Sequence, residues 1–331
     1  MTPLVAVTGA EGFIGSHLVE GLVHAGFRVR AMVLYNSFGS LGWLERLRPD
    51  VMEQVEVTFG DVRDPLSVRE CLRGCEVAYH LAALIAIPYS YQAPHSYVQT
   101  NVVGTLNVLE AVRDLEIPRM VHTSTSEVYG TARYVPIPET HPLQAQSPYS
   151  ASKIAADKLV ESYHLSFGLP VVTLRPFNTY GPRQSARAVI PTVISQIAAR
   201  HPVIRVGALK PTRDFNFVAD TVASFIAVGT APAGAVVGRT LNTGTGSEIS
   251  VQALVQAIAD VMERHVEIEQ DPQRLRPDAS EVMRLVGDSS ALRAVTGWQP
   301  RHTLHEGLAI TSRWFLDPGN LAHYRPDLYA V

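Results

Sequence analysis

The chain has 331 residues, of which 46% are hydrophobic and 18% charged, and its formal net charge is -3. This balance is typical of a folded globular protein and excludes a disordered chain, while the scattered lysines and arginines give no indication of a nucleic-acid partner. No apolar run approaches the roughly 18 residues of a membrane span. The start, MTPLVAVTGA, predicts a first strand rather than a signal peptide. We therefore expect a cytoplasmic protein with no membrane partner.

Short apolar runs alternate with helical patterns through the first half of the chain. The runs are rich in valine, as strands buried on both faces of a parallel sheet tend to be. The alternation predicts an α/β fold with a doubly wound parallel sheet. The predicted strands are Leu4 to Val7, Arg28 to Val33, Glu56 to Phe59, Val77 to Leu81, Arg119 to Thr123 and Val171 to Arg175.

Two features outside these strands also carry expectations. Cys71 and Cys75 lie one helical turn apart, and we expect buried small hydrophobes rather than a redox pair or a metal site. Tyr35, Phe38 and Trp43 follow the second strand and are expected to form a small satellite core or, alternatively, to cover a ligand.

The second half of the chain is less regular. The segment from Tyr180 to Gly207 is expected to be irregular, and the run FNFVADTVASFIAVG is expected to return to the sheet. We predict one domain from residues 1–179 plus about 212–245, and a discontinuous second lobe from residues 180–211 and 246–331.

The first predicted strand runs into TGAEGFIGSHL, which places Gly9, Gly12 and Gly15 between a strand and a helix. Glycines at this spacing allow a tight turn, close approach of a pyrophosphate to the backbone, and close packing of helix on strand. The pattern predicts a dinucleotide site. The second strand has Val33 near its end, with neither a carboxylate for the ribose nor an arginine directly after it for a 2′-phosphate, so the strand itself does not decide between the two cofactors. We expect NAD without excluding NADP, with Asn36 as a ribose contact and Asp61 as an adenine contact.

A second motif follows the fifth predicted strand. The sequence TSTSEVYG ends this strand, and YSASK then supplies Tyr149 and Lys153, four residues apart on one helix face. An ammonium beside a phenol lowers the pKa of the phenol, which makes Tyr149 a candidate base.

With these motifs the chain resembles the extended short-chain dehydrogenase/reductase family, in particular its nucleotide-sugar epimerases and dehydratases. The matching segments are TGAEGFIG, GDVRD, HLAA, NVVGTLNVLEA, TSTSEVYG, YSASK, RPFNTYGPRQ, TRDFNFVAD and RLRPDASE. The resemblance implies a Rossmann domain, a smaller C-terminal lobe for a nucleotide-diphosphate sugar, and a homodimer paired through the helices of Asn107 and Tyr149. It also implies cofactor contacts from Phe13, Ile14, Val62, Leu81, Ala82, Ala83, Thr100, Tyr149 and Lys153.

Within this family, 4-epimerases usually carry a small or apolar residue where this chain has Glu127. Thr125, Ser126 and Glu127 resemble the acid and base groups of hexose 4,6-dehydratases, and the overall pattern is similar to enzymes acting on nucleotide-linked N-acetylglucosamine. The implied roles are oxidation at C4 with Tyr149 as base, loss of the C5 proton to Glu127, and protonation of the leaving O6 hydroxyl by Ser126 or Glu127.

The resemblance also assigns substrate contacts and leaves alternatives. Asn178, Arg213 and Arg276 are expected at the diphosphate, and Arg187 at the sugar. Arg187 keeps a decarboxylase of nucleotide-linked glucuronic acid open as an alternative, beside a 4-epimerase. A regulatory protein that binds the cofactor without catalysis is a further alternative.

Overall fold

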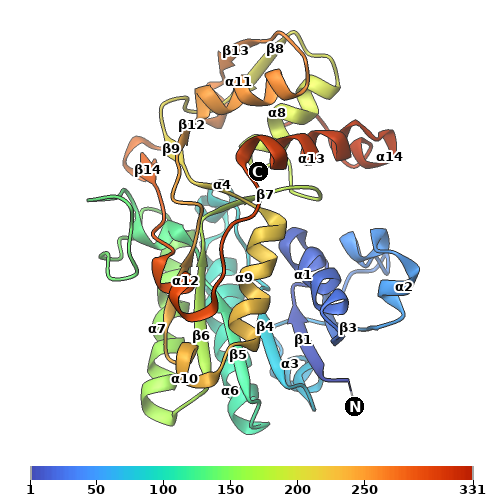
Figure 1. Cartoon of the computed structure of the whole chain (residues 1–331), viewed down its shortest axis with the longest axis vertical. Coiled ribbons are helices and arrows are strands. Elements are labelled where there is room, and N and C mark those ends of the chain that lie inside the picture. Colours follow the sequence, from blue (N-terminus) through green and yellow to red (C-terminus); the bar gives the residue numbers. More distant parts are fainter. Residues whose placement is uncertain (1, 330–331) are drawn as a thin grey trace.

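The computed structural model describes residues 2–329 and is built around a seven-stranded parallel sheet (Figure 1). All the strands predicted from the sequence belong to this sheet, so the doubly wound prediction is confirmed. The order reverses between β1 and β4, the position at which such sheets bind ligands beyond their carboxyl ends. In sheet order the strands are β11 (Thr240–Thr243), β6 (Val171–Pro176), β5 (Arg119–Thr123), β4 (Val77–His80), β1 (Leu4–Thr8), β2 (Arg28–Leu34) and β3 (Val55–Gly60).

Side chains that alternate along each strand supply a hydrophobic core on either face of the sheet. In β1, Val5 and Val7 join the core beneath α1 and α9, whereas Ala6 joins the core beneath α3, α6 and α7. This is the period-two pattern of a sheet covered on both sides. The covering helices are α1 (Phe13–His24), α3 (Pro65–Leu72), α6 (Gly104–Asp114), α7 (Pro148–Phe167) and α9 (Val218–Thr230). Cys71 and Cys75 are buried, as predicted.

Shorter elements connect these layers. They are η1 (Gly42–Arg46), α2 (Pro49–Met52), α4 (Ile87–Gln92), α5 (Pro94–Tyr97), the π-helical turn η2 (Val98–Val103), η3 (Ser126–Tyr129), α10 (Ala233–Val236), η4 (Pro272–Arg274), η5 (Asp278–Ser280) and α12 (Ser290–Thr296). Two small sheets pair β10 (Phe215–Phe217) with β7 (Asn178–Tyr180), and β9 (Thr212–Arg213) with β12 (Ile249–Ser250) and β14 (Arg284–Leu285).

Helices and one strand pair lie beyond the carboxyl ends of the main sheet, at the top of Figure 1. They are α8 (Val189–Ala198), β8 (Val203–Val206), α11 (Val251–Val261), β13 (Glu267–Gln270), α13 (Leu304–Leu316) and α14 (Pro318–Leu321). The expectation of an irregular segment from Tyr180 to Gly207 was therefore wrong at α8, whose residues from Ile190 to Ile197 are all buried. α8 is buried on all sides, so it lacks the exposed polar face by which periodicity identifies a helix.

The run FNFVADTVASFIAVG does not supply a strand of the main sheet. Its first residues form β10, and the rest is α9, which covers the sheet, whereas β11 supplies the returning strand. Buried Val218, Val222, Phe225 and Val228 recur every three or four residues. This spacing is helical, and the valines and phenylalanines concealed it because they also favour strands.

The aromatic residues after β2 do not form a satellite core. Tyr35 and Phe38 are 72% and 94% exposed. Trp43 instead packs against Trp314, His323 and Tyr324 of the C-terminal segment.

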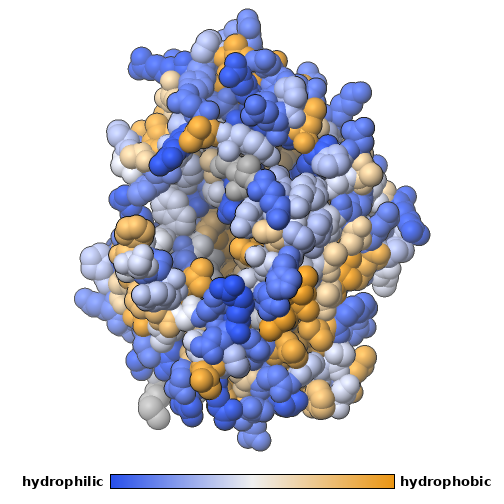
Figure 2. Space-filling model, turned by 180° about the vertical axis from the view of Figure 1, so that it is seen from behind, coloured by the Kyte–Doolittle hydropathy of each residue, from blue (hydrophilic) through white to orange (hydrophobic). Residues whose placement is uncertain are grey.

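Among residues 2–329, no helix is both long enough and apolar enough to cross a membrane. Seen from behind, the surface is hollowed where the upper part meets the sheet domain (Figure 2).

Candidate active site

One cavity of about 1300 Å³ lies beyond the carboxyl ends of the strands and reaches into the upper part of the molecule. Of all the site residues predicted from the sequence, only Asn36 is absent from its lining. The lining includes Gly9, Gly12, Phe13, Ile14, Gly15, Asp61, Val62, Leu81, Ala82, Ala83, Thr100, Thr125, Ser126, Glu127, Tyr149, Lys153, Asn178, Arg187, Arg213 and Arg276. The fold thus brings together residues that are far apart in the sequence.

The turn between β1 and α1 can be made only by glycine at two positions. Gly9 has φ +68°, and a Cβ atom there would lie 2.8 Å from the backbone N and Cα of Ala82. A Cβ on Gly15 would lie 2.1 Å from the carbonyl oxygen of Gly9. No side chain caps the first turn of α1. Its free N–H groups therefore face the cavity with the positive end of the helix, which fits a dinucleotide pyrophosphate.

Hydrogen bonds of Thr8 connect the ends of β1 and β4 beside this turn. The Thr8 hydroxyl oxygen accepts hydrogen bonds from the backbone N–H groups of Leu81 and Ala82, at 3.2 and 3.1 Å. Thr8 Oγ1 also lies 2.8 Å from His80 Nδ1, whose other ring nitrogen is 3.1 Å from Thr105 Oγ1. This buried chain holds the backbone of Leu81 and Ala82 against the glycine turn.

The predicted adenosine contacts are already engaged by neighbouring groups. Asn36 uses its amide within its own loop, where Nδ2 donates to the Ser40 carbonyl oxygen at 2.8 Å and Oδ1 accepts from the Ser40 N–H at 3.0 Å. Asp61 accepts from the Arg63 guanidinium, with Nε at 3.0 and 2.9 Å from the two carboxylate oxygens. Their contacts with a ribose or an adenine stay predictions.

The Ser/Thr-rich segment after β5 forms a tight turn, η3, that directs its side chains into the cavity. Thr125 precedes this turn, and its hydroxyl oxygen accepts from the Glu127 N–H at 3.2 Å. Ser126 is buried, and Glu127 is half-buried. Both line the cavity together with Thr125.

Tyr149 and Lys153 occupy the first two turns of α7. The helix begins after Ser147, whose side chain forms a reciprocal capping pair with Ser150, and this fixes the position of the first turn. Tyr149 and Lys153 are 7% and 4% exposed. The Lys153 ammonium donates to the Thr123 carbonyl oxygen at 2.7 Å.

The expected lowering of the Tyr149 pKa is not found in this structure. Burial raises the pKa of the phenol, a hydrogen bond with Thr125 opposes the rise, and the nearby Glu127 carboxylate adds to it. Burial also lowers the pKa of Lys153 to about 8, against the opposing charge of Asp157. Burial is the largest influence on the pKa of the phenol, and the Lys153 ammonium is directed to a backbone carbonyl.

A buried charge network beneath the lysine was missed in the sequence. Asp157 accepts from Arg175 Nη2 at 2.9 Å, from Ser124 Oγ at 2.8 Å and from His122 Nε2 at 3.2 Å. Burial acts to raise the Asp157 pKa, but these partners hold it at about 2. The available signal was an aspartate four residues after Lys153, on the same face of the helix.

The upper wall of the cavity carries basic groups opposite the turn η3. The charge of the Glu127 carboxylate acts on the buried Arg213, which also pairs with Glu281 at 3.2 Å. Arg276 Nη1 is 4.0 Å from the Glu281 carboxylate and has no hydrogen bond. The amide nitrogen of Asn178 is also buried without a partner. Glu281 was not predicted, although it ends the motif RLRPDASE.

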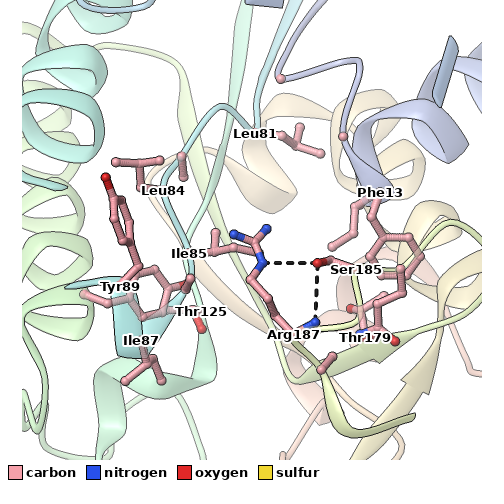
Figure 3. Close-up of a pocket in the computed structure, with 18 of the residues that line it drawn as sticks. Phe13, Leu81, Leu84, Ile85, Ile87, Tyr89, Thr125, Thr179, Ser185 and Arg187 are labelled. Atoms are coloured by element: carbon pink, nitrogen blue, oxygen red, sulfur yellow. Dashed lines mark hydrogen bonds between the residues drawn. The ribbon is translucent and has the colours of Figure 1, made fainter. Parts of the chain in front are cut away.

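Arg187 lies in the middle of the cavity (Figure 3). Its Nε donates to the Ser185 hydroxyl oxygen at 3.1 Å. In this view Ile85 and Tyr89 lie to the left of the Arg187 side chain, and Ser185 and Thr179 lie to its right (Figure 3). Among residues 2–329, no group of three or more His, Cys, Asp or Glu side chains could hold a metal ion.

Known proteins match this chain over almost its full length. The family model described as GDP-mannose 4,6 dehydratase matches residues 6–311. A dTDP-glucose 4,6-dehydratase from Xanthomonas campestris is 36% identical, covering 94% of this chain and 92% of the relative. A UDP-glucose 4-epimerase from Mycolicibacterium smegmatis is 34% identical, covering 93% and 97%.

A solved structure agrees with these relatives. The dTDP-glucose 4,6-dehydratase from Streptomyces venezuelae, determined with NAD bound, superposes with a TM-score of 0.85 at 28% identity, covering 98% of this chain and 99% of the other. The fold agrees with these matches. The chain belongs to the GDP-mannose 4,6-dehydratase family, the nucleotide-sugar dehydratases and epimerases of the extended short-chain dehydrogenase/reductase group.

Proposed function

We propose that this protein is an NAD-dependent 4,6-dehydratase that converts a nucleoside-diphosphate hexose or N-acetylhexosamine to its 4-keto-6-deoxy product. The observation that carries the proposal is the position of Glu127. Its carboxylate lines the same cavity as Tyr149 and is close enough to raise the pKa of the phenol. A base at C4 suffices for epimerisation, whereas dehydration needs a second group that removes the proton from C5.

The cofactor would be held by the glycine turn and by the backbone that faces it. Gly9, Gly12 and Gly15 give the pyrophosphate access to the N-terminus of α1, and Ala82 borders the same space. When bound, NAD would supply a hydride acceptor for C4 of the sugar and later a hydride donor for C6, so no net oxidation results.

Tyr149 takes the proton from the O4 hydroxyl in this proposal. Thr125, which lines the same cavity as the phenol, would hold O4 beside it. The raised pKa means that Tyr149 is protonated before ligands bind. Positive charge from Lys153 and from the bound oxidised nicotinamide would then favour the phenolate.

Glu127 acts on the C5 proton, which becomes acidic once C4 is a ketone. Ser126 or Glu127 would then protonate the departing O6 hydroxyl. Arg213 is buried in the lining of the same cavity, and its charge interacts with that of the Glu127 carboxylate.

The nucleotide part would bind to the upper wall. The unpartnered Asn178 amide nitrogen and Arg276 Nη1 are donors without acceptors, and a diphosphate supplies such acceptors. Arg213 would assist at the same phosphates. Pairing of two copies through α6 and α7 stays a prediction.

A second candidate function is favoured by Arg187. Its guanidinium lies in the cavity, where it could pair with the carboxylate of a nucleotide-linked glucuronic acid (Figure 3). Oxidation at C4 would then lead to loss of carbon dioxide instead of water.

Mass spectrometry of products from a panel of nucleoside-diphosphate sugars tests the proposal. The panel should combine uridine, guanosine, cytidine and thymidine carriers with glucose, N-acetylglucosamine, mannose and glucuronic acid. Loss of one water supports dehydration. An unchanged mass with altered chromatographic mobility indicates a 4-epimerase, and loss of carbon dioxide indicates the decarboxylase; either would overturn the proposal.

A further inference from the structure

The chain lacks the carboxylate that normally ends the second strand of a dinucleotide-binding fold and binds the adenosine ribose. β2 ends at Leu34, and the side chains of Leu34 and Tyr35 are 53% and 72% exposed. Asn36 follows, and its amide is engaged by Ser40. The next carboxylate, Glu45, accepts from the Leu41 N–H at 2.7 Å and the Ser40 hydroxyl at 2.9 Å, and so stabilises its own loop.

Another carboxylate reaches the end of β2 from the glycine turn. Glu11 lies between Gly9 and Gly12, and its Oε1 accepts from the Leu34 backbone N–H at 3.1 Å. Its carbonyl oxygen accepts from the Trp43 N–H at 3.0 Å, which fastens the loop after β2 to the same turn. Glu11 also lines the cavity.

The second carboxylate oxygen of Glu11 is buried and has no hydrogen-bond partner. Burial raises the pKa of this carboxyl, against the hydrogen bond from Leu34. A buried acceptor without a donor is costly, and a ligand hydroxyl would supply the missing hydrogen bond. The orphaned oxygen therefore indicates a donor that comes from outside the chain.

The position of Glu11 identifies that donor. The pyrophosphate of a dinucleotide lies at the N-terminus of α1, and its adenosine ribose lies next to it on the side of β2. Glu11 is the residue directly before the first-turn glycine, Gly12, and contacts the last residue of β2. Glu11 is therefore positioned to accept a hydrogen bond from a hydroxyl group of the adenosine ribose.

We propose that Glu11 binds the 2′-hydroxyl of the adenosine ribose and repels a 2′-phosphate, so that this protein selects NAD over NADP. The glycine turn thus supplies the recognition that β2 does not. The inference rests on the proposed function only in assuming that a dinucleotide binds; it does not depend on which sugar reaction follows.

Two arginines that line the cavity, Arg63 and Arg46, work against the selection of NAD, because a guanidinium attracts a 2′-phosphate. Arg63 is paired with Asp61, and an Arg46 guanidinium nitrogen lies 2.6 Å from His323 Nε2. Both arginines line the cavity. If either left its partner to bind a 2′-phosphate, NADP would bind well despite Glu11.

Calorimetric titration of the protein with NAD and with NADP, without any sugar, tests the proposal. For the native protein we expect NAD to bind at least about tenfold more tightly than NADP. Glu11→Gln keeps an acceptor for Leu34 but removes the charge, and should narrow this ratio by about 10- to 100-fold, the range of a charge-assisted hydrogen bond. Glu53→Gln, at an exposed position, is the matched control and should leave the ratio unchanged.

A second probe needs no variant. 2′-Deoxy-NAD lacks only the proposed donor and should bind the native protein about tenfold more weakly than NAD. Equal binding of NAD and NADP by the native protein, an unchanged ratio in a folded Glu11→Gln protein, or equal binding of NAD and its 2′-deoxy analogue would each overturn the proposal. If the protein selects NAD but converts no nucleotide sugar, the proposed function is contradicted and the proposal for Glu11 is not.

Discussion

The two ends of the cavity are built in different ways. Beside β1 and β4, the wall consists of backbone and glycine, and it works by shape, because added atoms would collide with Gly9 or Ala82. Beside β5 and α7, the wall consists of buried polar side chains, and it works by charge. Lys153 and Asp157 lie there with almost no exposure to solvent.

This difference predicts different sensitivities. The glycine end should not tolerate an added methyl group. At the α7 end, neutralising a buried charge should leave the fold intact but lower the enzymatic activity. The reason is that charges interact more strongly in a low-dielectric interior.

The largest expected effect is at the phenol. Tyr149→Phe removes the proposed base while leaving the ring in its buried site, so kcat should fall by about 10²- to 10⁴-fold. The 4-keto product is measured by its ultraviolet absorbance in alkali. Tyr35→Phe, at an exposed tyrosine, is the control. Near-native turnover of Tyr149→Phe would remove this residue from the mechanism.

The next effect distinguishes proton removal from O4, proposed for Tyr149, from proton removal from C5, proposed for Glu127. Glu127→Gln should slow elimination by about 10²-fold or more but permit oxidation at C4. Reduced cofactor should therefore accumulate during a single turnover, seen by its absorbance. Glu267→Gln, at an exposed position, should behave like the native protein. Unchanged dehydration by Glu127→Gln would contradict the assigned role.

A smaller effect tests the shape of the glycine end. Gly15→Ala should lower the free energy of unfolding by about 1–3 kcal/mol through overpacking and should also weaken NAD binding. Gly234→Ala is the control, because a Cβ there meets nothing within 4 Å. Thermal melting and NAD titration measure both effects. Equal stability of the two variants would show that the turn can open to accept a side chain.

The smallest effect concerns pH. If the Lys153 ammonium supports the phenolate, activity falls as pH rises through the lysine pKa of about 8. The charge of Asp157 raises that pKa, so Asp157→Asn should move the alkaline limb of the kcat profile to lower pH. Asp50→Asn, an exposed aspartate, is the control. A limb that stays in place would show that Asp157 does not position or tune Lys153.

The fold and the glycine turn were predictable because their signals are local. Short valine-rich runs that alternate with helical patterns and three closely spaced glycines are visible in the sequence, and the predicted strands were all found. The prediction failed at α9, where β-branched residues on a helical period resembled a strand.

Contacts between distant segments were not predictable in the same way. Glu11 and Leu34 are 23 residues apart, and Arg213 and Glu281 meet across 68 residues, so no local spacing indicates either pair. The raised pKa of the Tyr149 phenol was not predictable either, because burial of a side chain depends on the packing of the whole cavity. Sequence motifs predicted a set of residues that line one cavity, but not the charged groups packed around them.

A substrate labelled with deuterium at C4 tests the central claim most directly. The proposal requires Tyr149, Glu127 and NAD to act on one sugar ring, so nuclear magnetic resonance should find the deuterium at C6 of a 4-keto-6-deoxy product. A product that retains the deuterium at C4, or that carries none at C6, would contradict the account.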